Sequence, residues 1–424
     1  MDLIKKILQT DLFKITSLNS LSVLLKIGTS LITSKLLAVF VGPGGMALVG
    51  NLRNFSSSLE GISTLAFNSG IVKYVGENQR DKKELDKLIT TVLLSFLIIT
   101  SFLSILIFIF SDYFCYKIFG NNLQYEIVFK IIAIVLPWNA VSVLFISIIN
   151  GLGKYNKVIL ANIISNILCL LTSFILIYFF KTLGAFISIV IVPVIVVFVT
   201  SFYLPDEIQI FSRFDFHQYD FRVLKNLGKF SLMILPSTIL SPLFNLQIRN
   251  FLITTVGLHQ SGLWEAITRI SNLYLLFVST IVSVYFYPKL IKANIIDDIK
   301  EVILGFYKFI LPVFIIGTTA VYFLRFFIIK TLFTDEFLPL SELFFWQLTG
   351  DVFKVAGMIL GVFLMVRSKI LPYVFFELLS IILLYFLSLF FVKILGVEGV
   401  VIAQAIDNVV YLLMLSVYFR KYLF

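Results

Sequence analysis

Residues 154–184 read KYNKVILANIISNILCLLTSFILIYFFKTLG. Lysines stand at both ends of this stretch, and residues 158–180 between them carry no charge. An α-helix needs about 20 mostly apolar residues to cross a bilayer, so we expect a membrane-spanning helix here. The whole chain of 424 residues is 59% hydrophobic and 14% charged, whereas soluble domains are about half apolar and a quarter charged. This excess of apolar residues must face lipid.

Runs of the same kind recur along the chain and predict an all-α polytopic membrane protein of about twelve transmembrane helices. The connections between them are short, and even residues 205–221 are too few for a catalytic domain. The expected spans lie at roughly residues 13–40, 46–74, 86–112, 124–150, 158–180, 184–204, 223–254, 261–290, 299–326, 339–366, 370–392 and 397–419.

The net charge of +10 has its source in the connections between these helices. Every second connection is rich in Lys and Arg, as around Arg80 and Arg222. The alternate ones carry few cations: Lys117, Lys181, Arg325, Lys330 and Lys393. Cytoplasmic loops of membrane proteins carry this excess, so both termini are predicted to be cytoplasmic. The same explanation of the charge argues against a nucleic-acid partner.

The opening stretch has a counterpart in residues 367–396, which read RSKILPYVFFELLSIILLYFLSLFFVKILG. The spacing from lysine to glycine agrees, since 184 − 157 = 27 and 396 − 369 = 27. Val41-Gly42 and Val256-Gly257 form another pair, at an offset of 215. We therefore expect two six-helix lobes around a central cavity, related by a pseudo-twofold axis along the membrane normal. Their bounds are residues 1–205 and 223–424, with a cytoplasmic linker at 206–222.

Polar and ionisable side chains form stripes along several of these apolar helices. Each ion at mid-helix costs roughly 2.5–3.5 kcal/mol, so such residues usually face a polar interior. Cations exceed acids in the first half, and Arg suits phosphate oxygens, which predicts an anionic cargo. The candidate substrate-binding residues are Lys26, Arg53, Asn245, Arg249, Arg269 and Asn272. The candidates for charge balance or for binding a coupling cation are Glu60, Glu265, Asp351, Lys354 and Asp407.

A structural interpretation stands beside the functional one for these charges. Glu265 and Arg269 have the i, i+4 spacing of an ion pair within one helix. Lys35, Lys130 and Lys308 have stems long enough to reach the membrane interface.

Motifs for catalysis, metals or nucleotides are missing from the sequence. Cys115, Cys169, His217 and His259 do not have the spacing of metal ligands. The run Gly42-Pro43-Gly44-Gly45 is not followed by the Lys-Ser/Thr of a phosphate-binding loop. The sequence therefore predicts a secondary transporter, with no catalytic residues, metal site or cofactor.

Three segments resemble a known family. TSKLLAVFVGPGGMALVGNLRNF at 33–55, GIVKYVGE at 70–77 and FFWQLTGDVFKVAG at 344–357 are similar to the Wzx-type flippases of lipid-linked O-antigen and enterobacterial common antigen units. That family belongs to the multidrug/oligosaccharidyl-lipid/polysaccharide exporter superfamily. The resemblance implies two six-helix lobes and an undecaprenyl-pyrophosphate-linked oligosaccharide moved to the periplasmic leaflet of the bacterial inner membrane. It also implies a polymerase and a chain-length regulator as neighbours.

One position departs from the resemblance. The common-antigen branch carries an acidic residue in helix 8 where this chain has Asn272. An O-antigen unit of unknown composition is therefore the preferred cargo.

Four alternatives remain open on the sequence. A multidrug cation antiporter of the same fold would offer acids to its cargo, where helix 1 here has lysines. A lipid II flippase usually has two extra helices, for which 424 residues leave little room. A membrane glycosyltransferase or O-antigen polymerase would need a large outer loop. A channel or scaffold would not need matched charged stripes.

Overall fold

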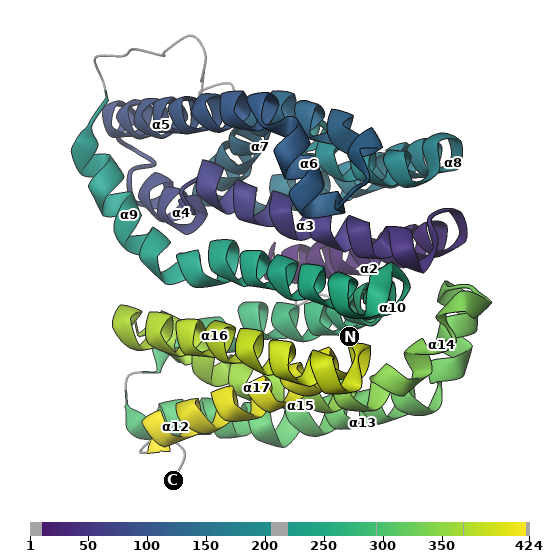
Figure 1. Cartoon of the computed structure of the whole chain (residues 1–424). Helices are drawn as coiled ribbons and strands as arrows, with labels where there is room; N and C mark the ends of the chain where they lie inside the picture. Colours follow the sequence, from purple (N-terminus) through teal and green to yellow (C-terminus); the bar gives the residue numbers. More distant parts are fainter. Residues whose placement is uncertain (1–10, 205–218, 294, 368, 421–424) are drawn as a thin grey trace. The chain divides into compact units, whose positions relative to one another are not determined.

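The computed structural model describes residues 11–204, 219–293, 295–367 and 369–420, and helices make up nearly all of this described part (Figure 1). Most of the expected linker, including His217, lies outside the described residues, as do residues 1–10. The helices before the linker are α2 (Asp11–Phe40), α3 (Gly42–Ser63), α4 (Asn68–Glu77), α5 (Lys82–Ile109), α6 (Ser111–Phe119), α7 (Glu126–Gly151) and α8 (Tyr155–Ser201).

The second half of the chain continues the same pattern after Asp220. π-helical turns at Pro236–Leu240, Val282–Phe286 and Phe306–Ile310 join some neighbouring helices end to end. The helices are α9 (Phe221–Leu235), α10 (Ser241–Ile281), α11 (Tyr287–Lys292), α12 (Ile296–Gly305), α13 (Leu311–Phe323), α14 (Arg325–Leu332), α15 (Leu340–Val366), α16 (Ile370–Leu395) and α17 (Val397–Tyr418).

Nine helical segments of the described residues are long and apolar enough to cross a membrane. Two of them, Tyr155–Ser201 and Ser231–Lys292, each cover two expected spans. The two spans of each segment meet where the backbone leaves helical geometry, at Lys181 and at Gly257. The expected span at 46–74 corresponds to α3 and α4 together. All twelve expected spans therefore have a helical counterpart.

The expected second span is interrupted, which the sequence did not predict. α3 ends at Ser63 and α4 begins at Asn68. Between them Leu65 and Ala66 both have φ of 51°, in the left-handed region that non-glycine residues rarely adopt. Tight turn hydrogen bonds close this break, among them Ala66 N–H to the Gly61 carbonyl at 3.0 Å.

The internal repeat is visible in the backbone. Gly42 and Gly257 both have positive φ, 70° and 91°, at an offset of 257 − 42 = 215. Lys181 and Gly396 form a second such pair, with φ of 49° and 62° at an offset of 396 − 181 = 215. The sequence paired Gly184 with Gly396 instead, at an offset of 212. The backbone angles shift this register by three residues, from an offset of 212 to one of 215. The equivalent turns are the two with positive φ, at Lys181 and Gly396.

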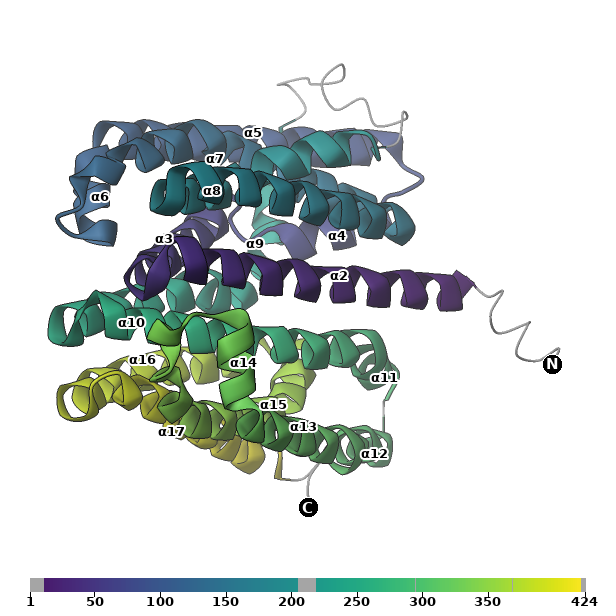
Figure 2. The same ribbon diagram turned by 90° about the vertical axis from the view of Figure 1, so that its right-hand side faces the viewer.

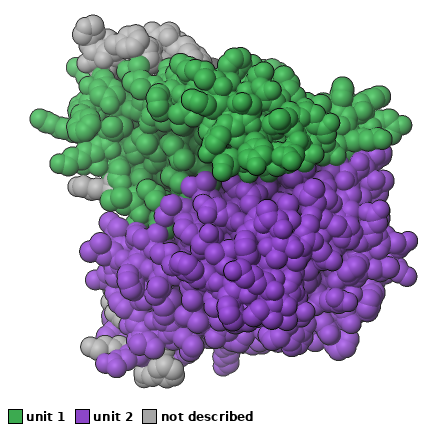
Figure 3. Space-filling view, in the orientation of Figure 1, with its two compact units in different colours: residues 1–33, 55–239 green, residues 34–54, 240–424 purple. Residues whose placement is uncertain are grey.

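Contacts divide the chain into two compact units, coloured differently in Figure 3. Unit 1 comprises Met1–Thr33 and Phe55–Ile239, and unit 2 comprises Ser34–Asn54 and Leu240–Phe424. This grouping places α9 in unit 1 and residues 34–54 in unit 2, unlike the expected bounds at 205 and 223. The lobe bounds at residues 205 and 223 stay a prediction.

In unit 1, α5, α7 and α8 lie side by side in both views of the ribbon (Figures 1 and 2). The core is formed by apolar faces of α4, α5, α7 and α9. Fully buried members include Ile71, Val92, Leu144, Ile148 and Leu227. In a bilayer such contacts are favoured by van der Waals packing, because lipid tails are as apolar as these side chains.

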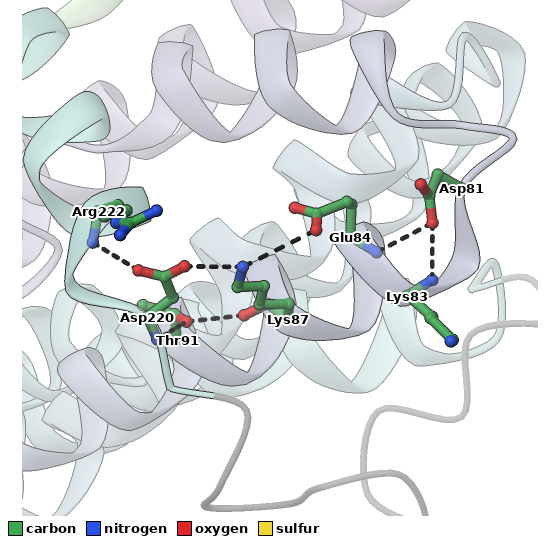
Figure 4. A network of polar contacts seen from close by, with 7 residues as sticks. All are labelled: Asp81, Lys83, Glu84, Lys87, Thr91, Asp220 and Arg222. Carbon is green, nitrogen blue, oxygen red and sulfur yellow. Dashed lines mark hydrogen bonds and ion pairs between the residues drawn. The ribbon is translucent and has the colours of Figure 1, made fainter.

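A polar network attaches the start of α9 to α5 within unit 1 (Figure 4). Asp220 accepts a hydrogen bond from Arg222 N–H at 2.7 Å and so caps α9. Its carboxylate also pairs with Lys87 Nζ at 2.7 Å, and its N–H donates to Thr91 Oγ1 at 3.1 Å. These contacts hold the start of α9 against α5.

In unit 2, α15 and α17 approach closely through glycines. A Cβ on Gly350 would lie 2.9 Å from Ala405 Cα, and Gly357 and Gly361 both lie against the Tyr411 side chain. Small residues at such spacing let transmembrane helices pack backbone to backbone. This close packing brings the polar residues of α15 and α17 together.

Candidate functional site

Four of the predicted site residues form one charged cluster in unit 2. Glu265 Oε2 lies 2.9 Å from Arg249 Nη1, and its Oε1 lies 2.9 Å from Arg269 Nε. Arg53 Nη1, from α3, lies 3.4 Å from Glu265 Oε1. The expected i, i+4 ion pair of Glu265 and Arg269 is therefore confirmed. Arg249 also stacks on the Trp264 ring, 4.6 Å from its centroid.

Local backbone features make room for this charged cluster. The positive φ of Gly257 kinks α10 between Arg249 and Glu265. A Cβ on Gly50 would lie 2.3 Å from Arg249 Nη1 and 2.4 Å from Glu265 Oε2, so only glycine fits beside the unshifted pair. Asn51 of α3 donates a hydrogen bond to Asn250 Oδ1 at 2.7 Å and holds the two helices together.

The charged cluster has three guanidinium groups for one carboxylate, so its formal charge is +2. The side chains of Arg249 and Arg269 are only 3% and 5% exposed, whereas that of Arg53 is 43% exposed. Within the described residues, Arg249 Nε and Arg269 Nη2 are buried without a hydrogen-bond partner. A desolvated surplus of positive charge attracts anions strongly. Arg53 is the member through which an anion can reach this charge.

Five other predicted residues line one cavity of about 370 Å³ in unit 2. The cavity lies among α10, α15, α16 and α17, and these residues are Asn245, Asn272, Asp351, Lys354 and Asp407. Glu377, Tyr373, Tyr411 and Gln404 also line it and were not among the candidates. A carboxyl group inside the apolar run 370–392 is the signal that would have added Glu377.

The carboxyl groups of this cavity are held by neutral donors. Asp351, 2% exposed, accepts hydrogen bonds from Ser271 Oγ at 2.6 Å, from the Tyr274 hydroxyl and from Gln347 Nε2. Asp407 accepts from Ser380 Oγ at 2.9 Å, and Glu377 accepts from the Tyr411 hydroxyl at 2.7 Å.

The charge of this unit 2 cavity is a separate matter from that of the cavity expected between the two halves, whose cationic lining stays a prediction. Three carboxyl groups face one ammonium group, that of Lys354, so the lining is acidic. Within unit 2, a positive surplus lies in the arginines around Glu265. Helical periodicity predicts that all these residues lie on polar stripes. It does not separate the arginines around Glu265 from the residues that line the cavity, because that separation depends on how the helices pack.

Lys26 and Glu60 belong to unit 1. Lys26 is exposed on α2. Glu60, on α3, lines a pocket of about 490 Å³ together with Asn68, Lys73, Ser147 and Asn150. A single cavity shared by the two halves of the chain stays a prediction.

Comparison with solved structures defines the class of fold. The chain is similar to a multidrug resistance MATE family transporter of the MOP superfamily in an inward-facing conformation, with a TM-score of 0.82 and 14% identity over 94% of each chain. It is also similar to the lipid II flippase MurJ in an inward closed conformation, with a TM-score of 0.74 and 16% identity. That match covers 95% of this chain and 87% of the other. The expected twelve-helix, two-lobe fold class is confirmed.

Sequence comparison defines the family within that class. A family model described as polysaccharide biosynthesis protein matches residues 12–293, more than half of the chain. The chain belongs to this family and is a multi-pass membrane protein. It is 25% identical to the lipid III flippase of Escherichia coli (strain K12) over 390 residues, which cover 92% of this chain and 94% of that protein. The lipid III flippase of Shigella flexneri matches equally.

Proposed function

We propose that this protein is a flippase for an undecaprenyl-pyrophosphate-linked oligosaccharide, an O-antigen repeat unit. It moves this cargo by alternating access from the cytoplasmic to the periplasmic leaflet of a bacterial inner membrane. The charged cluster around Glu265 carries the proposal, because it holds a surplus positive charge with Arg53 half-exposed. Membership in a polysaccharide biosynthesis family and the similarity to lipid III flippases support it.

Each group has a role in this proposal. Arg53 binds the pyrophosphate, since a guanidinium matches phosphate oxygens in a bidentate way. Arg249 and Arg269 make the surroundings of Arg53 electropositive, and Lys26 in unit 1 is a further cation for binding the cargo. The carboxyl groups Glu60, Asp351 and Asp407 are the candidates for binding the proton or cation that drives transport. The polyprenyl tail stays in lipid.

The remaining parts of the proposal concern location and neighbours. Both termini are cytoplasmic, as the distribution of Lys and Arg favours. A polymerase and a chain-length regulator act on the cargo after it crosses.

The leaflet that holds the lipid-linked oligosaccharide tests this proposal. An impermeant glycosidase is applied to spheroplasts of cells that lack the protein, or that express wild type, Arg53→Ala or the control Arg80→Ala. Arg80 is exposed in the connection after α4. We expect the lipid-linked oligosaccharide to be accessible with wild type and Arg80→Ala, and inaccessible without the protein or with Arg53→Ala. Equal accessibility in all four strains would contradict the proposal.

A second candidate is a multidrug cation antiporter, which the acidic lining of the unit 2 cavity favours. Carboxyl groups of this kind would attract cationic drugs. Such a protein would lower the accumulation of ethidium in cells, and the Asp407→Asn variant would restore it. The flippase proposal predicts no change in ethidium accumulation.

A further inference from the structure

The unit 2 cavity is rich in groups that accept hydrogen bonds. Carboxylates are acceptors only, and three of them line the cavity: Asp351, Glu377 and Asp407. Within the described part of the chain, the amide oxygens of Gln347 and Gln404 are also buried and accept no hydrogen bond. A buried acceptor left without a donor is destabilising, so this lining favours a ligand that brings donors.

The lining of the same cavity is acidic, because carboxyl groups outnumber ammonium groups in it. Its three carboxyl groups are held by the neutral donors Ser380, Tyr411, Ser271, Tyr274 and Gln347. Lys354 supplies the single ammonium group of the lining. A carboxylate on the ligand would be repelled by these acidic groups in a desolvated site and would be rejected here.

The size and surface of the cavity suit a carbohydrate. Its volume of about 370 Å³ lies within the range of small-ligand pockets, which is about 300–1,000 Å³. The amides of Asn245, Asn272 and Asn408 offer donors and acceptors side by side, and Tyr373 and Tyr411 add aromatic surface. Tyr411 is fixed in place, because its ring lies against Gly357 and its hydroxyl donates to Glu377.

We infer that this cavity holds the carbohydrate part of the cargo and selects neutral sugars and amino sugars over sugars that carry a carboxylate group. The inference rests on the proposed function and narrows its substrate class. It divides the cargo between two sites of unit 2: the arginines around Glu265 bind the pyrophosphate, and the acidic cavity binds the sugars. Asp351 and Asp407 then accept hydrogen bonds from the sugar, and Glu60 in unit 1 is left as the candidate for the coupling proton or cation.

Saturation-transfer NMR on the purified protein in nanodiscs tests the selectivity. The probes are methyl glucoside, methyl glucosaminide and methyl glucuronide; the second and third each differ from methyl glucoside in a single group, the amine at C2 or the carboxylate at C6. We expect the glucosaminide and the glucoside to bind at least about tenfold more tightly than the glucuronide, a ratio set by like-charge repulsion. Equal binding of all three, or preference for the glucuronide, would overturn the inference.

Variants locate the selectivity in the cavity. Asp407→Asn and Glu377→Gln remove charge with little change in shape, and we expect each to reduce the preference over glucuronide. The control Glu342→Gln removes an exposed charge from the first turn of α15, outside the cavity, and should leave it unchanged. Preserved selectivity in both cavity variants, with the proteins folded by size-exclusion chromatography, would refute the assignment.

The leaflet measurement separates this inference from the proposed function. If wild type exposes the lipid-linked oligosaccharide outside but binds the three glycosides equally, only the inference is wrong. If the lipid-linked oligosaccharide reaches the outer leaflet without the protein, the proposed function is wrong and the inference falls with it.

Discussion

At the scale of single residues, Glu265 is the group on which the charged cluster depends. Its two oxygens face Arg53, Arg249 and Arg269, and it is itself 3% exposed. Burying a guanidinium without a counter-ion is far more costly than burying the pair. The cluster therefore combines a structural ion pair with a positive charge that Glu265 leaves uncompensated.

Replacing Glu265 by Gln should destabilise the protein strongly. Breaking a buried pair on one side typically costs about 3–5 kcal/mol, and here Arg249 and Arg269 both lose their partner. We expect a clear fall in the thermal unfolding temperature of the purified protein in detergent. Glu342→Gln, on the surface of α15, serves as the control and should unfold like wild type. An unchanged Tm for Glu265→Gln would show that the carboxylate does not hold the arginines.

The sequence predicted much of the site at this scale. Asp351 and Asp407 stood out as acids in apolar helices, and they do share one cavity with Asn245 and Asn272. Glu377 was left out of the candidates although its carboxyl group interrupts the apolar run 370–392, because the sequence does not show which helices face it. The kink at Gly257 and the packing between helices decide which cations cluster and which acids line a cavity. Helical periodicity in the sequence predicts neither the kink nor the packing.

At the scale of helices, the kinks are set by a few backbone positions. Gly257 has φ of 91° and ψ of 169°, a region populated essentially by glycine alone. It separates the segment of α10 that carries Arg249 from the segment that carries Glu265. The kink therefore allows one long helix to supply both partners of a buried ion pair.

The substitution Gly257→Ala should strain this kink. The cost expected for such a backbone conformation is of order 1–3 kcal/mol, seen as a lower Tm. The control Gly317→Ala changes a glycine inside α13 that has open space around its Cβ position. Alanine there should be neutral or stabilising, since glycine costs about 0.5–1 kcal/mol in a helix. If the two variants had the same Tm, the kink at Gly257 would need no glycine.

The start of α9 should respond to pH through Asp220. The hydrogen bond from Lys87 is the largest influence that holds the pKa of Asp220 below its ordinary value of 3.8. A lowered carboxyl pKa stabilises the fold above the ordinary value, and this contribution disappears as the pH falls through the lowered one. Hydrogen exchange of residues 219–223, corrected for its intrinsic rate, should stay slow at pH 7 and down to pH 3.8.

The matched variant for this prediction is Asp220→Asn. It removes the charge and should raise exchange at the start of α9 already at pH 7. Asp298→Asn, in the first turn of α12, is the control that leaves this region alone. Unchanged protection in Asp220→Asn would mean that the contact with Lys87 does not hold α9.

Helix positions were predicted well and helix interruptions poorly. The ends expected at 40, 366 and 370 agree with α2, α15 and α16, since Gly, Lys and Arg mark them in the sequence. Leu65 and Ala66 have no turn preference, so the break between α3 and α4 had no local signal. Tertiary packing decides such breaks.

At the scale of the whole molecule, the charge distribution predicts how the chain crosses the membrane. We expect Asn121→Cys, in the turn after α6, to react with an impermeant maleimide in intact cells. Arg80→Cys should react only after permeabilisation. Both positions are exposed, and the native Cys115 and Cys169 are first replaced by Ser. Labelling of Arg80→Cys from outside would reverse the predicted orientation.

The repeat belongs to the same scale. The paired backbone turns at Gly42 and Gly257, and at Lys181 and Gly396, support two equivalent halves more directly than sequence identity does. Lys181 shows why the sequence offset failed here: a lysine in one half stands where the other half has glycine.

The central claim, that the protein itself moves a pyrophosphate-linked lipid, is tested most directly in proteoliposomes of purified protein. A fluorescent polyprenyl-pyrophosphate-linked glucosaminide is the probe, and the uncharged polyprenyl glucosaminide is its control. Transfer to the opposite leaflet is read by quenching with an impermeant reductant. We expect wild type to accelerate transfer of the pyrophosphate lipid but not of the uncharged one, and Arg53→Ala to abolish the difference. Equal transfer of both lipids, or no acceleration by wild type, would contradict the account.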